Sequence, residues 1–317
     1  MESEQLVSII VPCKQIDEHA NECIVHCLDL DYERLEILVL PDAGGMRGDP
    51  RVKVVPTGAL TPGAKRNLAM KESTGSILAF IDSDAYPRRD WLRTASGHLR
   101  DATVSAVGGP GVTPDADNDM QKGSGFVLSS FLVGTLRRRY SPGSVFYSDD
   151  IHSCNFVAKR EIMERVKWNE KYWPGEDTLL SLDLSKLGVK MLEAEDVVVY
   201  HHRRELFLPH LKQVSSFGLH RGLFFRKYPG NSRKVTYVLP SMMVLCAIAL
   251  AAMSAFNPPA MKVFLGCLLI YSLMVLAGAL PAGSVKLIAL TWIGIILTHI
   301  AYGISFMIGI SRRDLER

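Results

Sequence analysis

The sequence predicts an α/β domain followed by a membrane-embedded helical part, and two observations lead to this fold class. Short apolar runs alternate with helix-like segments through the first half of the chain, which is typical of a mainly parallel sheet with helices on both faces. After Val235, three almost uncharged stretches follow one another, and each has about the 20 residues that a helix needs to cross a bilayer. We therefore expect residues 1–234 to form the α/β domain and residues 235–317 an anchor.

The elements of the α/β domain are predicted from their hydrophobic pattern and from the residues that end them. Helices are expected at 17–30, 63–73 and 178–187. Each has helical character and a terminal signal, either acidic residues near its first turn or a glycine after its last. Strands are expected at the β-branched or continuously apolar runs 6–11, 35–40, 51–55, 76–81 and 196–200.

The anchor is expected to contain three spans, at 235–256, 263–280 and 287–310. Helices of a water-soluble core are the alternative, but they would be shorter and amphipathic. Three crossings that start from the cytoplasm would leave Arg312 and Arg313 outside, against the positive-inside rule. This leaves open that one segment is re-entrant or interfacial, with a turn near Pro258 or Pro281.

The net charge of +3 hides a local excess of basic residues. Residues 203–234 contain eight lysines and arginines and one acid, Glu205, directly before the first span. Such a belt predicts contact with anionic lipid headgroups and a cytoplasmic catalytic domain. Within it, residues 209–228 are expected to form a basic helix that lies at the membrane interface, or alternatively covers the sheet. The chain shows no aromatic and basic recognition module, so nucleic acid is not an expected partner.

The six cysteines and the N-terminus bear on the compartment. The cysteines form no CxxC pair, so neither a zinc site nor a disulfide framework is expected. The first residues are polar and acidic, unlike a signal peptide. We expect a multi-pass protein of the inner (plasma) membrane whose catalytic domain faces the reducing cytoplasm.

Acidic side chains follow two of the predicted strands. Asp82 and Asp84 come directly after the run 76–81, and Asp42 follows the run 35–40. Two carboxylates one residue apart can hold Mg²⁺ or Mn²⁺, which shares its coordination with substrate phosphates. Aspartates at strand ends also cap turns, which is the alternative. Lys65 and Arg66 begin a helix that should open onto the same edge of the sheet and favour an anionic ligand.

A second acidic pair, Glu176 and Asp177, follows the turn Trp173-Pro174-Gly175 and begins a predicted helix. The helix dipole favours the charged form of both acids there, as a general base requires. Ordinary acids of a first helical turn are the alternative explanation.

The ordered set of these motifs resembles a known family. The stretches "VSIIVPCKQIDEHANECIVHCLDLDYERLEILVLPD", "GAKRNLAMKESTGSILAFIDSDAYPRRDWL", "NFVAKREIM" and "WPGEDTLLSLDLSKLG" together resemble family 2 inverting glycosyltransferases of the GT-A fold. The resemblance covers about residues 6–226, and succinoglycan-type exopolysaccharide glucosyltransferases have a similar architecture.

The resemblance implies roles for individual residues. It implies that Pro12 and Asp42 lie against the nucleoside, usually uridine, and that Arg66 lies near the donor. Asp82 and Asp84 would bind Mn²⁺ or Mg²⁺ and the donor diphosphate, and Asp177, next to Glu176, would be the catalytic base.

Two departures from the family pattern qualify these implications. The loop "LPDAGG" lacks one acid of the usual Asp-Asp-Gly-Ser, which puts a donor contact in doubt. The region with Gln213 and Arg221 lacks the Q-x-x-R-W motif of processive synthases, so one sugar per acceptor is expected. His202 and Arg203, after the strand near 200, are candidate phosphate or acceptor contacts, like Gln213 and Arg221. His201 or His202 could also complete a metal site, or the segment could be a basic surface turn.

The expected function is transfer of a sugar from a nucleotide-diphospho-sugar, with UDP as the expected nucleotide, to a lipid-linked acceptor, polyprenyl-linked or other. The product would belong to cell-surface or exopolysaccharide glycan synthesis. A polyprenyl-phosphate sugar synthase, a sugar-phosphate nucleotidyltransferase and a non-catalytic membrane scaffold are the alternatives.

Overall fold

The computed structural model describes residues 4–45 and 48–315, which fall into two compact units. The α/β unit contains the residues up to 112 and residues 138–202, and the helical unit contains residues 113–137 and 203–315. The domain boundary expected at residue 234 stays a prediction; by packing contacts, the segments 113–137 and 203–234 group with the apolar helices. The physical reason is close packing between helices, described below.

The main sheet of the α/β unit has eight strands in the order β3-β2-β1-β4-β9-β6-β10-β8. Strands β3 to β4 run parallel, as predicted, but β9 is antiparallel to both β4 and β6, and β8 is antiparallel to β10. Strand β6 runs parallel to β10, so most neighbouring strands are parallel, as predicted, in a sheet that is mixed overall. The strands are β1 (Val7–Pro12), β2 (Leu35–Leu40), β3 (Val52–Val54), β4 (Ile77–Ile81), β6 (Val104–Gly108), β8 (Phe146–Ser148), β9 (Asn155–Lys159) and β10 (Lys190–Glu193).

A small second sheet contains β5 (Ala85–Pro87), which follows β4 in the sequence, together with β11 (Val199–His201) and β7 (Gly111–Val112). Strand β11 is antiparallel to β5, and their register pairs His201 with Ala85. This pairing brings the end of β11 next to the acidic turn that follows β4.

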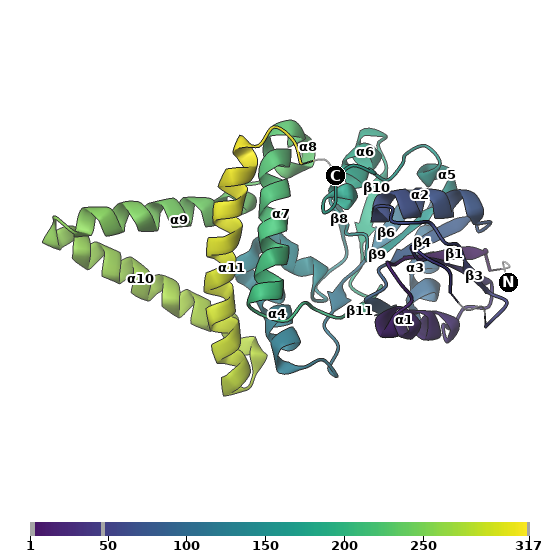
Figure 1. Ribbon diagram of the computed structural model, residues 1–317, viewed down its shortest axis with the longest axis horizontal. Coiled ribbons are helices and arrows are strands. Elements are labelled where there is room, and N and C mark those ends of the chain that lie inside the picture. The colour runs from purple at the N-terminus through teal and green to yellow at the C-terminus, as the bar shows by residue number, and fades with distance from the viewer. Residues whose placement is uncertain (1–3, 46–47, 316–317) are drawn as a thin grey trace. The chain divides into compact units, whose positions relative to one another are not determined.

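Helices cover both faces of the main sheet (Figure 1). Helices α1 (Glu18–Leu28) and α3 (Trp91–Leu99) bury their apolar side chains on one face. Helices α2 (Pro62–Glu72), α5 (Arg160–Met163) and α6 (Glu176–Lys186) pack on the other face. Asp17 and Thr61 cap α1 and α2 by accepting hydrogen bonds from the amides of Ala20 and Ala64.

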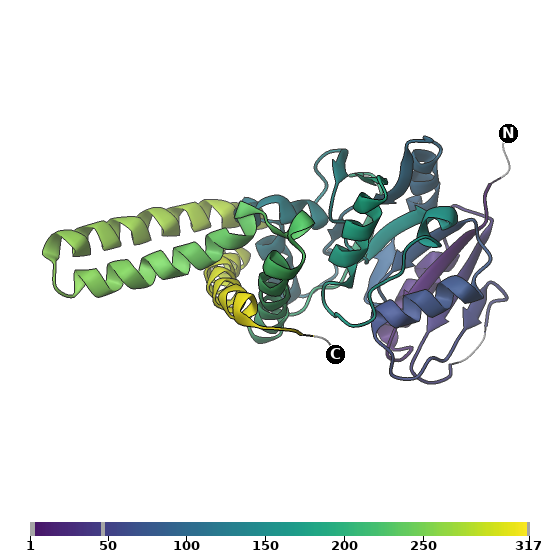
Figure 2. The ribbon, with the colours of Figure 1, turned by 90° about the horizontal axis from the view of Figure 1, so that it is seen from above.

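The helical unit contains three helices that are long and apolar enough to cross a membrane, over Val235–Ser254, Pro258–Ala282 and Val285–Ser311. They correspond to α9 (Val235–Ser254), α10 (Pro258–Ala279) continued by a 3₁₀ turn (Leu280–Ala282), and α11 (Val285–Ser311). Helices α9 and α10 form a hairpin (Figure 2). Its apolar side chains, such as Ile248 and Leu269, are about 60% exposed, which is typical of a surface that lipid covers.

The remaining helices of this unit pack on α11. Helix α7 (Leu208–Lys227) runs along it, and α4 (Asp119–Ser129) also contacts it, while α8 (Pro229–Ser232) is a single turn after α7. Close approach depends on glycines, because a Cβ at Gly222 would lie 2.1 Å from the Phe306 carbonyl oxygen and one at Gly309 would lie 2.0 Å from that of Leu219. The basic helix predicted at 209–228 is therefore present, packed against a candidate span; its place at a membrane interface stays a prediction.

Candidate active site

The carboxyl ends of β1 and β2 are joined by Lys65 of α2. Its ammonium, with a side chain only 4% exposed, donates hydrogen bonds to the carbonyl oxygens of Cys13 (2.6 Å) and Leu40 (3.1 Å) and to the Asp42 carboxylate. Pro12, the last residue of β1, is buried beside this group. The sequence predicted only that Lys65 favours an anion; in the structure it orients Asp42, the candidate nucleoside contact.

Arg66 joins the two acidic motifs, which are far apart in the sequence. Its Nη1 donates to Glu176 Oε1 at 2.8 Å, and its Nη2 donates to Asp82 Oδ1 at 2.7 Å. Nη2 also donates to Ser153 Oγ at 3.1 Å, and the guanidinium lies 4.7 Å from the ring centroid of Trp168. Arg66 is 2% exposed, so the two motifs share one buried cation, although the Asp82 side chain is 31% exposed.

Burial and charge act in opposite directions on this network. Burial alone would lower the pKa of the Arg66 guanidinium, but the carboxylates of Asp82 and Glu176 outweigh it and raise that pKa. Burial raises the pKa of Glu176 to about 7, against the lowering effect of Arg66. Arg66 is therefore a permanent cation, whereas Glu176 exchanges its proton near neutral pH.

Asp177 is the more accessible of the two acids at the start of α6. Its side chain is 19% exposed, compared with 6% for Glu176, and it accepts a hydrogen bond from the Thr178 amide at 2.7 Å. Gly175, with a φ of 115°, provides the turn before the helix. The predicted helix start is confirmed, and the side chain of Asp177 is more accessible to solvent than that of Glu176.

Arg139 is a residue of this region that the sequence analysis did not single out. Its Nη2 lies 2.8 Å from Asp150 Oδ1, and its Nη1 lies 3.8 Å from Asp177 Oδ2. The structure places the Arg139 guanidinium between these two carboxylates, an arrangement that no local sequence pattern predicts.

Asp82, Asp84 and His201 form a group suited to a divalent cation. One donor atom from each lies within 4.8 Å of the others, and His201 Nε2 is 3.2 Å from Asp84 Oδ1. Carboxylate oxygens suit Mg²⁺ and Mn²⁺, and an imidazole nitrogen is a common ligand of transition metals. The donor set therefore fits the ion that the resemblance implies, and of the two histidines considered from the sequence the pairing of β5 with β11 selects His201.

The other candidate contacts interact with residues of their own units. His202 bonds through Nε2 to Glu22 Oε2 at 2.8 Å within the α/β unit. Arg203, Gln213 and Arg221 belong to the helical unit. There Arg203 donates to Thr113 Oγ1 (3.2 Å), and Arg221 lies 4.4 Å from the ring centroid of Tyr237. Their roles as phosphate or acceptor contacts stay predictions.

The architecture is that of a GT-A-type nucleotide-sugar transferase domain. It has paired aspartates after β4, a strand parallel to its neighbour β1, and a buried arginine that joins them to a second acidic pair. The sequence model of glycosyl transferase family 2 matches residues 8–166, half of the chain, and the chain belongs to this family.

Relatives and a solved structure agree with this assignment. The chain is 30% identical over 151 residues to the pre-mycofactocin glycosyltransferase of Mycobacterium tuberculosis, a match that covers 46% of this chain and 31% of the relative. It is 20% identical to a dolichyl N-acetylglucosaminyl phosphate glucuronosyltransferase of Methanococcus voltae, over 70% of this chain and 74% of the relative. The fold is similar to a mannosyltransferase from Pyrobaculum calidifontis in complex with GDP-Man and Mn²⁺, with a TM-score of 0.64, 20% identity and coverage of 96% of this chain and 88% of that one.

Proposed function

We propose that this protein is a membrane-anchored inverting glycosyltransferase that moves one sugar from a nucleoside-diphosphate sugar to a lipid-linked acceptor. The observation that carries the proposal is the Arg66 link, which joins Asp82 to the Glu176–Asp177 pair in one buried network. A displacement reaction needs its leaving-group site and its base at a short, fixed separation.

In this mechanism Asp177 is the base. Its carboxylate takes the proton of the acceptor hydroxyl while that oxygen attacks the anomeric carbon from the face opposite the nucleotide. The new bond from oxygen to carbon forms as the bond from carbon to phosphate oxygen breaks, and the nucleoside diphosphate leaves with the electron pair. Asp177 lies in the first turn of α6, and Arg139 Nη1 is 3.8 Å from its Oδ2.

The donor would lie along the carboxyl ends of β1, β2 and β4. Pro12 and Asp42 would contact the nucleoside, with Asp42 oriented by Lys65. Asp82, Asp84 and His201 would hold Mn²⁺ or Mg²⁺, which when bound neutralises negative charge on the leaving diphosphate. The resemblance favours UDP as the nucleotide, whereas the similar Pyrobaculum enzyme contains GDP-Man, so the test includes both.

The acceptor is proposed to be lipid-linked because three candidate spans and the basic belt would keep the enzyme where such a substrate diffuses. The name of the Methanococcus relative, which describes a dolichyl phosphate sugar acceptor, supports this class. We place the catalytic domain at the cytoplasmic face of the inner membrane and the product in surface glycan or exopolysaccharide synthesis. A polyprenyl-phosphate sugar synthase, which would use the lipid phosphate itself as acceptor, is the second candidate.

The test is sugar transfer by membranes that contain wild-type protein, Asp177→Asn or the control Asp183→Asn. Asp183 lies on the same helix, is half exposed and pairs only at the surface with Lys186. Each membrane receives labelled UDP- and GDP-sugars with Mn²⁺, Mg²⁺ or EDTA, and either polyprenyl phosphate or a lipid-linked sugar. We expect transfer from one donor that EDTA abolishes, that Asp183→Asn retains and that Asp177→Asn lowers by about 10²–10⁴-fold.

Equal transfer by wild type and Asp177→Asn would refute the base, and transfer that EDTA leaves unchanged would refute the metal role. Labelled product on polyprenyl phosphate alone would select the second candidate. No sugar transfer with any donor and acceptor would favour the non-catalytic scaffold. Formation of a nucleotide sugar from a sugar phosphate would favour a nucleotidyltransferase.

A further inference from the structure

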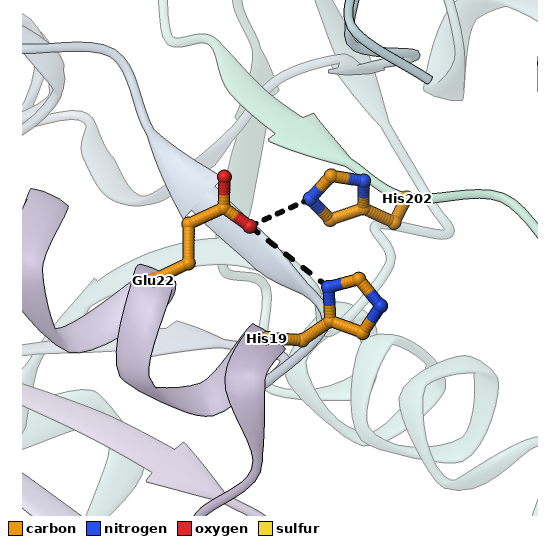
Figure 3. A group of neighbouring side chains, drawn as sticks. All are labelled: His19, Glu22 and His202. Carbon is orange, nitrogen blue, oxygen red and sulfur yellow. Dashed lines mark hydrogen bonds and ion pairs between the residues drawn. The ribbon is translucent and has the colours of Figure 1, made fainter. Parts of the chain in front are cut away.

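A second group of potential metal ligands includes the residue that directly follows β11. His19 and Glu22 lie one helical turn apart on α1, and His202 directly follows β11 (Figure 3). His202 Nε2 is 2.8 Å from Glu22 Oε2, and His19 Nδ1 is 3.9 Å from the same oxygen. One donor atom from each residue lies within 4.8 Å of the others. We propose that His19, Glu22 and His202 form a second metal site, which takes Zn²⁺.

The choice of metal follows from the donor set. Two imidazole nitrogens and one carboxylate oxygen are a common set of protein ligands for zinc with one open position, whereas the oxygen-rich group of Asp82, Asp84 and His201 suits Mn²⁺ or Mg²⁺. The two groups therefore differ in chemistry, although His201 and His202 are consecutive in the chain.

The distances suit a small four-coordinate ion. Ligand atoms about 2.0–2.2 Å from zinc in a tetrahedron are roughly 3.3 Å apart. The separations of 2.8 Å and 3.9 Å lie on either side of that value. His19 is half exposed, so its ring can turn to close the longer separation without displacing a buried neighbour.

Packing holds the side chain of His202, the third proposed ligand, in place. The side chain of His202 is 13% exposed, and its ring centroid lies 4.5 Å from that of His19 and 5.7 Å from that of Tyr86. Tyr86 in turn stacks on Tyr200 at 5.1 Å, and the His202 amide donates to the Asp84 carbonyl oxygen at 3.0 Å. A simple hydrogen-bonded pair of His202 and Glu22 would not require His19, which at 3.9 Å is too far for a hydrogen bond.

A metal at this site would join α1 to the end of β11. Because His202 is the next residue after His201, the ion would also restrain the strand that presents His201 to Asp84. The second site would thus be a positioning device for the first, and it requires no assumption about which sugar is transferred.

The test measures Zn²⁺ binding by the full chain in detergent, after removal of metal, with Zn²⁺ alone as the ligand. Asp82→Asn combined with Asp84→Asn removes the carboxylates of the neighbouring group and serves as the background. In this background we expect one bound zinc per chain by elemental analysis, and affinity lowered at least about tenfold by His19→Ala or His202→Ala. His26→Ala is the matched control, because His26 lies on the same helix and stacks on Tyr86 but is outside the group.

Cobalt gives an independent readout. Co²⁺ in the site should show the intense visible absorption of a four-coordinate ion, and His19→Cys should keep the binding while adding a sulfur-to-metal charge-transfer band. His19 is half exposed, so its variants should elute like wild type in size-exclusion chromatography. The proposal would be overturned if the background variant bound no zinc, or if the His19→Ala chain bound zinc as tightly as the background variant.

Discussion

Each of the two units buries a polar network, and the two networks compared below differ in charge. Arg66 there lies between the carboxylates of Asp82 and Glu176. In the helical unit, His210 is fully buried between Ser124 Oγ (2.7 Å from Nδ1) and Thr298 Oγ1 (2.8 Å from Nε2). Burial lowers the pKa of His210 to about 4, so this network is neutral.

The difference between the two networks reflects the cost of burying charged and neutral groups. Buried charges are costly and are retained where a charged ligand or a reaction requires them, whereas hydroxyl groups and a neutral imidazole satisfy one another at little cost between apolar helices. The charged network around Arg66 is therefore suited to a charged ligand, whereas the neutral network around His210 stabilises packing between helices.

The largest effect is expected from removal of the shared cation. Arg66→Met leaves Glu176 and Asp82 without their buried partner, so we expect a loss of about 3–5 kcal/mol in unfolding free energy. Thermal unfolding in detergent measures it, and Arg89→Met, at a side chain that is 75% exposed, is the control. Equal melting temperatures for the two variants would show that the network is not essential for stability.

The second prediction concerns Glu176 and pH. Its pKa is about 7 in the folded chain and about 4.5 in the unfolded one, so folding favours the protonated form. The resulting stabilisation is complete below pH 4.5 and is lost as pH rises through 7, by roughly 3 kcal/mol at most. Relative to Glu176→Gln, which does not titrate, the wild type should lose melting temperature between pH 5 and 8; parallel curves would contradict the raised pKa.

His210 should show the opposite slope. Its pKa falls from 6.5 when unfolded to about 4 when folded, so its contribution is present above pH 6.5 and is lost as pH falls towards 4, again by roughly 3 kcal/mol at most. Comparison of wild type with His210→Gln over this range measures it. If the wild type instead gains stability relative to His210→Gln at low pH, the pKa of His210 is not lowered and its network is not neutral.

The smallest effect is expected from a substitution that disturbs helix packing and changes no charge. Gly222→Ala places a methyl group 2.1 Å from the Phe306 carbonyl oxygen, so α7 and α11 must separate at a cost of about 1–3 kcal/mol. Gly266→Ala is the control, because no atom lies within 4 Å of its added Cβ. If both variants melt like wild type, α7 does not depend on contact with α11.

Much of the fold could be predicted because the signals are local. The strand at 35–40 and the helix start at Glu176 agree with the structure, and the three apolar segments agree in length and composition. Strand β9 was not predicted as an element, and its antiparallel direction reflects long-range pairing with β4 and β6 that a short buried run does not encode.

For the candidate site, the sequence determined which residue types follow which strands, since Asp42, Asp82 and Asp84 come at the ends of continuous apolar runs and Glu176 and Asp177 begin a helix. Only the tertiary structure decided that Arg66 joins Asp82 to Glu176, and that His201 faces Asp84 while His202 faces Glu22. The physical reason is that strand ends and helix starts are set by neighbouring residues, whereas ion pairs between distant segments depend on sheet order and register.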